Sequence, residues 1–109
     1  MNDSILAEMY DVVISRRESK EEGSYTAYLF REGIDKILKK VGEECAETII
    51  AAKNGEKEPI INETADLLYH LNVMLAELDI DVREVEDNLR ERRKKSGNLK
   101  KMKKVDKNT

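Results

Sequence analysis

The stretch that decides the fold is KKVGEECAETIIAAKNG, residues 39–55, in which an apolar helical pattern carries three closely spaced carboxylates. Apolar and small residues recur every three or four positions, and Gly55 is a typical C-terminal stop. This pattern predicts a helix over residues 35–54. Glu43, Glu44 and Glu47 crowd its middle, although like charges at i,i+4 destabilise an isolated helix by about 0.2–0.5 kcal/mol per pair. The predicted apolar stripe consists of Ile34, Ile37, Val41, Cys45, Thr48, Ile49 and Ala52.

Helical patterns also flank this segment on both sides. Periodic apolar residues predict a first helix that begins near Ile5, and the charged run SRRESKEEGS, residues 15–24, interrupts it. No segment alternates as a β-strand does, so we predict an all-α bundle of four main helices and one short helix. The other predicted helices are residues 25–32 capped by Ser24, residues 59–78 with Pro59 in the first turn, and residues 82–95 behind an Asp81 and Glu84 capping box.

The predicted helix over residues 59–78 is apolar on two opposite sides. Ile61 and Leu68 lie on one face, whereas Tyr69 and Val73 lie on nearly the opposite face. A helix that is apolar on both sides is usually buried on both sides. A chain of 109 residues has too little mass to surround one of its own helices, so the sequence favours a homodimer that completes the bundle.

Composition excludes several classes of protein. No apolar run is long enough to span a membrane, and the N-terminus lacks the features of a signal peptide. The single cysteine, Cys45, cannot form an internal disulfide and fits a reducing compartment, so we expect a cytoplasmic protein without a membrane partner. The overall charge is −3, and residues 96–109 carry five Lys against one Asp. We expect one domain over residues 1–95, with an acidic surface unlike that of a nucleic-acid binder, and a mobile basic tail over residues 96–109.

The carboxylates form a constellation that two helices share. Glu44 and Glu47 flank the apolar stripe of one predicted helix, and Glu63 and Asp66 are i,i+3 neighbours on the next. A short loop would bring these antiparallel flanks together. Converging carboxylates repel one another, and a hard divalent cation such as Mg²⁺ or Mn²⁺ offsets that repulsion. The same spacing also occurs on solvated helix faces, which is the plainer alternative.

Basic residues adjoin the acids and suit a phosphate-bearing ligand. Lys36 and Lys40 precede Glu44 on the same flank of the predicted helix. A divalent cation and neighbouring lysines together neutralise phosphate charge. The sequence contains no Gly-x-x-x-x-Gly-Lys loop, so a P-loop mechanism is excluded.

Three segments resemble one family of enzymes. They are SYTAYLFREG (residues 24–33), GIDKILKKVGEECAETIIAAKNGEK (33–57) and ETADLLYHLNVMLAELDIDVREVEDNLRERR (63–93). Glu-Glu-x-x-Glu followed by Glu-x-x-Asp is the signature of all-α nucleotide pyrophosphohydrolases. The SYTA and DLLYHL segments narrow the resemblance to phosphoribosyl-ATP pyrophosphohydrolase, the second enzyme of histidine biosynthesis. It covers residues 5 to about 97.

The resemblance implies a fold, a reaction and a set of site residues. It implies a helical homodimer that uses Mg²⁺ to hydrolyse phosphoribosyl-ATP to phosphoribosyl-AMP and pyrophosphate. Glu43 and Glu47 would position or deprotonate the attacking water. Independently of the resemblance, Arg93 at the end of the last predicted helix would either reach substrate phosphate across the dimer or only favour its helix C-terminus. The remaining implied residues are Glu44, Glu47, Glu63 and Asp66 as metal ligands, and Lys36, Lys39 and Lys40 as phosphate contacts.

Two other functions fit the residues less well. A house-cleaning nucleoside triphosphate pyrophosphatase would keep the chemistry and change the substrate. A non-catalytic helical interaction module would leave the acids as a solvated face. Among the aromatic residues, Tyr25 and Tyr28 suit either adenine stacking or core packing. His70, one turn after Asp66, suits a structural hydrogen bond more than a phosphate contact.

Overall fold

Five helices make up most of the chain that the structure describes. The computed structural model describes residues 4–19 and 22–95, and within these ranges it contains helices and no strand. This confirms the all-α prediction with four longer helices and one short one. The predicted basic tail lies outside the described residues. The helices are α1 (Ile5–Ser19), α2 (Tyr25–Glu32), α3 (Ile34–Asn54), α4 (Lys57–Glu77) and α5 (Val82–Lys94).

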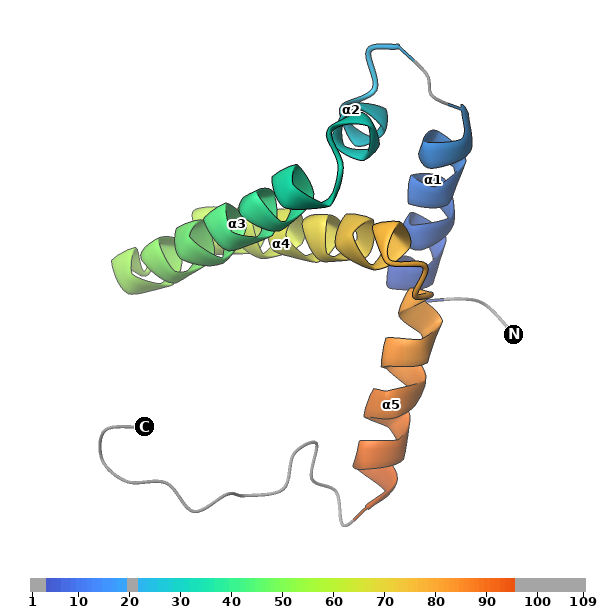
Figure 1. Ribbon diagram of the computed structural model, residues 1–109. Coiled ribbons are helices and arrows are strands. Elements are labelled where there is room, and N and C mark those ends of the chain that lie inside the picture. Colours follow the sequence, from blue (N-terminus) through green and yellow to red (C-terminus); the bar gives the residue numbers. More distant parts are fainter. Residues whose placement is uncertain (1–3, 20–21, 96–109) are drawn as a thin grey trace.

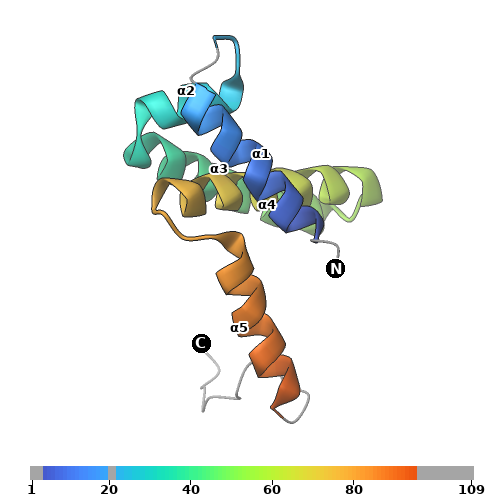
Figure 2. The ribbon, with the colours of Figure 1, turned by 90° about the vertical axis from the view of Figure 1, so that its right-hand side faces the viewer.

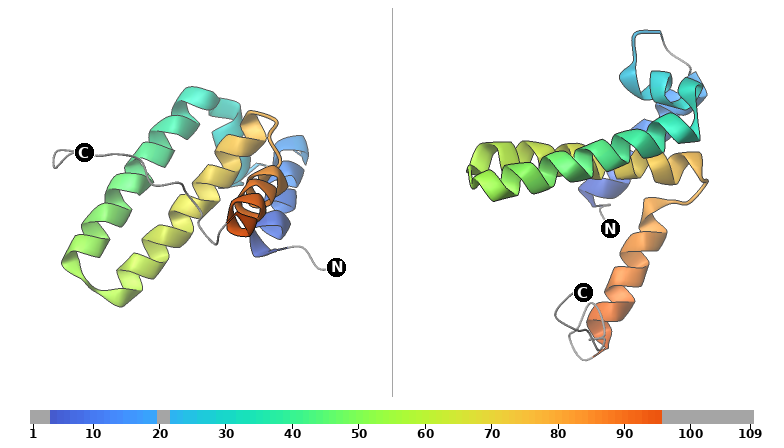
Figure 3. Two further views of the ribbon diagram at one scale, coloured as in Figure 1. Left: turned by 90° about the horizontal axis from the view of Figure 1, so that it is seen from below. Right: turned by 60° about the vertical axis from the view of Figure 1, so that its left-hand side comes forward.

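The long helices α3 and α4 form an antiparallel hairpin, and they lie side by side along their length (Figures 1 and 3). Gly55 ends α3 in a left-handed conformation, with φ of 77°. Its N–H donates to the carbonyl oxygens of Ala51 and Ala52, which satisfies groups left open at the helix end. Only Gly55 and Glu56 separate the two helices, so the acidic flanks of α3 and α4 face each other at short range.

The hydrophobic core lies at one end of this hairpin. There α1 packs against α2 and α4, and α2 also packs against α3 and α4, as Figure 2 shows from the side. Leu29 from α2, Ile37 from α3 and Val73 from α4 are fully buried in it. The far half of the hairpin extends beyond this core, so the acids in its middle stand at the edge of the packed region.

Helix α1 is longer than the sequence pattern predicts. The charged run that was expected to interrupt it continues as helix to Ser19. Arg17 explains the extension, because its guanidinium donates to the Ala76 carbonyl oxygen at 2.7 Å and to Asp79 at 3.2 Å. A run of charged residues therefore does not end a helix when a tertiary hydrogen bond, here that of Arg17, stabilises the last turn. Helix α4 likewise begins two residues before Pro59, at Lys57.

The apolar stripe predicted for α3 is partly wrong. Ile37 is buried, but Ile49 is 68% exposed and Ala52 is also exposed, whereas Glu44 and Ala51 are buried. The side of α3 that faces α4 therefore contains a glutamate. On α4, Ile61 and Leu68 are exposed by 54% and 40%. The second apolar face of the hairpin has no cover within the described part of this chain.

Helix α5 begins with the predicted capping box and points away from the other helices (Figure 1). The Asp81 side chain accepts from the Arg83 N–H at 2.9 Å, and the Glu84 carboxylate accepts from the Asp81 N–H at 3.2 Å. Arg83 also ties α5 to α1 through a 2.8 Å ion pair with Asp11. Of the helices that the structure describes, none has the length and apolar character needed to cross a membrane.

Candidate active site

Three carboxylates meet in the middle of the α3–α4 hairpin. Glu44 comes from α3, and Glu63 and Asp66 come from successive turns of α4. One oxygen of each side chain lies within 4.8 Å of one oxygen of both others. The structure therefore brings together three of the four acids that the sequence analysis proposed as metal ligands.

Glu44 is a buried carboxylate, with 6% of the residue exposed. Its Oε2 is buried and has no hydrogen-bond partner among the residues that the structure describes, and the same holds for Oε2 of Glu63. Burial raises the pKa of Glu44, the neighbouring Glu47 and Asp66 raise it further, and Lys40 lowers it. Buried polar atoms without partners are uncommon in native proteins and call for a ligand or ion.

Glu47 lies beside this group but is not one of the three carboxylates whose oxygens come together. A hydrogen bond with Glu47 raises the pKa of Glu63, and burial and the charges of Glu47 and Glu44 raise it further. Glu47 is exposed, so it stands on the solvent side of the cluster. This position suits a group that contacts water or substrate as well as it suits a metal ligand.

Thr48 sets the register of the two helices next to the acids. Its hydroxyl lies 2.7 Å from the carbonyl oxygen of Glu44 and 3.2 Å from that of Glu63. The first is a bond within α3, and the second crosses to α4. The sequence analysis treated Thr48 only as a member of the apolar stripe. The sequence did offer a signal for this contact, because Thr48 follows the candidate ligand Glu44 by one helical turn.

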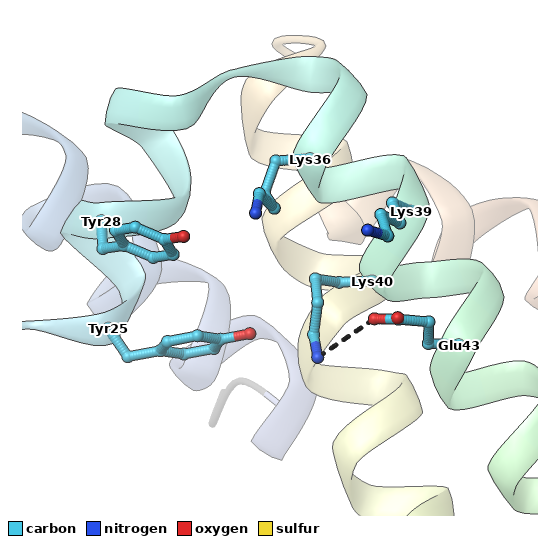
Figure 4. A pocket seen from close by; sticks show the side chains of 6 residues that line it. All are labelled: Tyr25, Tyr28, Lys36, Lys39, Lys40 and Glu43. Atoms are coloured by element: carbon cyan, nitrogen blue, oxygen red, sulfur yellow. Dashed lines mark ion pairs between the residues drawn. The ribbon is translucent and has the colours of Figure 1, made fainter.

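The lysines form a separate pocket next to the acid cluster. Its volume is about 300 Å³, and Figure 4 shows its side chains pointing toward one another from α2 and α3. Lys40 pairs with Glu43 at 3.3 Å, and its charge also acts on Glu44. The ammonium of Lys36 lies 5.9 Å from the centre of the Tyr28 ring. The pocket is lined by Tyr25, Tyr28, Lys36, Lys39, Lys40 and Glu43.

Arg93 is the one proposed site residue that the structure leaves apart from both groups. It lies in the last turn of α5. Helix α5 contacts α1 and α4 but not α3 among the described residues. Within one chain, Arg93 therefore does not belong to the pocket that the α3 lysines line.

The acid cluster fits a hard divalent cation. Carboxylate oxygens are the ligands that Mg²⁺ and Mn²⁺ prefer. The two buried oxygens without partners, on Glu44 and Glu63, are the atoms that such an ion would satisfy. An adjoining basic pocket suits the phosphates that commonly complete the coordination of Mg²⁺.

Fold and site together define a class of protein: an all-α chain with a carboxylate cluster whose oxygens suit a hard cation, beside a basic pocket that suits a polyphosphate. Comparison with known proteins identifies the family within that class. Residues 6–93 match the family described as phosphoribosyl-ATP pyrophosphohydrolase. The chain belongs to this family of hydrolases.

Individual relatives agree with this assignment. A phosphoribosyl-ATP pyrophosphatase of Clostridium novyi is 48% identical over 91% of this chain and 90% of the relative. One from Geobacter sulfurreducens is 52% identical over 91% of this chain and 92% of the relative. A histidine biosynthesis bifunctional protein of Thermoanaerobacter pseudethanolicus is 54% identical over 77% of this chain, which covers 39% of that protein.

Proposed function

We propose that this chain hydrolyses phosphoribosyl-ATP to phosphoribosyl-AMP and pyrophosphate, the second step of histidine biosynthesis. Family membership over residues 6–93 is the observation that carries the proposal. The juxtaposition of the acid cluster with the lysine pocket supports it independently, because the leaving group is a polyphosphate.

The proposed roles divide the site into two parts. Glu44, Glu63 and Asp66, with Glu47 beside them, would hold Mg²⁺, with Mn²⁺ as the alternative. When bound, the cation supplies neutralisation of phosphate charge and activation of water. Lys36, Lys39 and Lys40 would bind the phosphates that leave as pyrophosphate.

Water is the proposed nucleophile, and carboxylates guide it. Glu43 and Glu47 are exposed side chains on the same helix as the buried Glu44, so both are open to solvent. They would orient the water and take its proton as it attacks. The bond between the α and β phosphates then breaks, and the lysines stabilise the charge that develops on the departing pyrophosphate.

A homodimer in the cytoplasm is part of the same proposal. The exposed apolar side chains of Ile49, Ile61 and Leu68 support an interface along the hairpin. In such a dimer Arg93 would approach the lysine pocket of the partner subunit and contact the phosphates bound there.

The decisive experiment measures pyrophosphate release from phosphoribosyl-ATP with and without Mg²⁺, beside a panel of ordinary nucleoside triphosphates. We expect metal-dependent release from phosphoribosyl-ATP alone. Glu44→Gln and Asp66→Asn should each lower turnover by at least about 100-fold, the scale on which a well-placed catalytic group acts. Glu58→Gln, an exposed acid on the same helix as Asp66, is the matched control.

Each other outcome has a definite meaning. Release from the triphosphates instead would keep the mechanism and overturn the substrate. Release from no substrate, together with thermal stability that Mg²⁺ leaves unchanged, would favour a non-catalytic helical module.

A further inference from the structure

A buried histidine between α2 and α4 has no part in the proposed binding of metal or phosphate. His70 is 5% exposed, and both of its ring nitrogens lie at hydrogen-bond distance from a partner. Nδ1 is 2.7 Å from the Asp66 carbonyl oxygen, and Nε2 is 3.1 Å from the Tyr25 hydroxyl. The ring also packs edge-on against Tyr25 and Tyr69, with centroids 5.8 and 4.8 Å apart. These contacts hold the imidazole in one orientation.

The two partners of His70 fix where the protons lie. The Asp66 carbonyl oxygen can only accept, so Nδ1 carries the hydrogen and donates it. In the neutral ring Nε2 is then an acceptor, and the Tyr25 hydroxyl must donate to it. The Tyr25 oxygen has no second proton, so toward any other neighbour it can act only as an acceptor.

That oxygen faces the lysine pocket. Tyr25 lines the pocket, and its hydroxyl is hydrogen-bonded to His70. Figure 4 shows the Tyr25 hydroxyl pointing toward the Lys40 side chain, whose ammonium pairs with Glu43 at 3.3 Å. Burial raises the pKa of the Tyr25 hydroxyl and the charge of Lys40 lowers it, so the hydroxyl and the ammonium are close enough to interact electrostatically.

We propose that His70 is a positioning residue that holds the Tyr25 hydroxyl as a hydrogen-bond acceptor, which in turn orients the Lys40 ammonium for bound phosphate. The inference rests on the proposed function in one respect, that the lysine pocket receives the pyrophosphate end of the substrate. It assigns to His70 an effect on phosphate binding although its ring lies outside the pocket.

A second link between α2 and α4 distinguishes two possible roles of His70, orienting the Tyr25 hydroxyl and only holding the two helices together. The hydroxyls of Thr26 and Tyr69 are hydrogen-bonded to each other, and this pair also joins α2 to α4. Neither residue lines the lysine pocket. Tyr69→Phe therefore removes a comparable tie between the helices and leaves the acceptor in the pocket unchanged.

The test compares four variants of the full chain in two assays. Isothermal titration measures binding of inorganic pyrophosphate with Mg²⁺, and steady-state kinetics measure KM and kcat for phosphoribosyl-ATP. His70→Asn keeps a donor toward Asp66 but loses the acceptor for Tyr25, and Tyr25→Phe loses the hydroxyl itself. The other two are the double variant and Tyr69→Phe.

We expect the two single substitutions to weaken pyrophosphate binding and raise KM by about tenfold each, the scale of one charge-assisted hydrogen bond. The double variant should be no worse than either single one, because both remove the same link. Tyr69→Phe should lower thermal stability and leave KM within about twofold of the wild type.

A spectroscopic signature checks the proton positions directly. Long-range ¹H–¹⁵N spectra should show the Nδ1–H tautomer of His70 in the wild type and in Tyr69→Phe. The Nε2 resonance should move in Tyr25→Phe, because its donor is lost. An Nε2–H tautomer in the wild type would overturn the inference.

The remaining outcomes separate this inference from the proposed function. If the chain binds pyrophosphate with the expected pattern but does not hydrolyse phosphoribosyl-ATP, the inference stands and the function fails. If the chain hydrolyses phosphoribosyl-ATP and Tyr69→Phe raises KM as much as His70→Asn does, His70 only holds α2 and α4 together and the inference fails. Additive effects in the double variant, or a wild type that binds no pyrophosphate, would also overturn it.

Discussion

Glu44 shows at the level of a single residue what the acid cluster does to the protein. Its folded-state pKa is raised by burial and by the charges of Glu47 and Asp66 above the ordinary value of 4.5. A raised pKa means that the folded protein binds the proton more tightly than the unfolded chain does. The associated stability is complete below about pH 4.5 and is lost as pH rises through the folded pKa. The metal-free site therefore destabilises the fold at neutral pH.

We predict that Glu44→Gln raises the melting temperature of the metal-free protein near pH 7. The amide is neutral and can donate to the neighbouring carboxylates, so a buried charge is replaced by a hydrogen bond. For a domain of this size, each 1 kcal/mol moves the melting temperature by about 4–8 °C. Calorimetry in the presence of a chelator measures the change. A lower melting temperature than that of the Glu58→Gln control would contradict the prediction.

A second prediction concerns how Mg²⁺ stabilisation depends on pH. Since the cation binds ionised carboxylates, it competes with the protons that the raised pKa values of Glu44 and Glu63 retain. The shift in melting temperature caused by Mg²⁺ should therefore be small near pH 5 and larger near pH 8. At 100 times its dissociation constant, the ion should add about 2.7 kcal/mol. The same titration with Glu44→Gln should lose most of the shift, and a shift independent of pH would argue against coordination by these acids.

The acids of the site could be predicted from the sequence, but their environments could not. Glu44, Glu63 and Asp66 were placed together because spacing on two consecutive helices fixes which flanks face each other. The sequence put Glu44 at the edge of an apolar stripe, whereas it is buried. The cross-helix contact of Thr48 and the bond between His70 and Tyr25 depend on tertiary packing, which periodicity within one helix does not describe.

At the level of elements, the α3–α4 hairpin depends on how α3 ends. Gly55 has φ of 77°, a region that residues with a Cβ enter at a cost. Gly42, in contrast, lies within α3, and a Cβ added there would meet nothing within 4 Å among the residues that the structure describes. A glycine within a helix often marks the close approach of a neighbour, but the described part of the chain places none there.

We predict opposite effects of alanine at these two glycines. Gly55→Ala should lower the free energy of unfolding by about 1 kcal/mol, because the left-handed conformation strains an L-residue. Gly42→Ala should raise it by about 0.5–1 kcal/mol, because alanine restricts the unfolded chain and favours the helix. Urea denaturation measures both. Destabilisation by Gly42→Ala would mean that another subunit approaches α3 at this point.

The helix order and the local caps were predictable because they depend on neighbouring residues. Ser24 accepts from the Ala27 N–H, and the Asp81 capping box forms as its spacing indicates. The end of α1 was not predictable. It depends on the bond from Arg17 to the Ala76 carbonyl oxygen, across 59 positions of sequence. Signals from neighbouring residues therefore predict a capped helix start, but they do not predict a helix end that depends on a tertiary contact.

At the level of the whole molecule, the described residues leave one side of the α3–α4 hairpin uncovered. The core gathers at one end of the hairpin, and Ile49, Ile61 and Leu68 remain exposed beyond it. Helix α5 points away from the hairpin (Figure 2). It carries its own exposed apolar pair, Val85 and Leu89, at i,i+4 spacing. Contiguous exposed apolar surface marks an interaction site more often than a free surface. A second copy of the chain would cover the exposed apolar side chains of the hairpin and of α5 together.

We predict that the protein is a dimer whose assembly Leu68→Lys disrupts. A lysine at the centre of an apolar interface leaves a buried charge without a partner, so dissociation should become more favourable by several kcal/mol. Sedimentation equilibrium should give a dimer for the wild type at micromolar concentration and a monomer for Leu68→Lys. Because folding and association are linked, the variant should also melt at a lower temperature. Ile5→Lys, at a position 74% exposed on α1, should remain dimeric, and a monomeric wild type would show that the hairpin face stays uncovered.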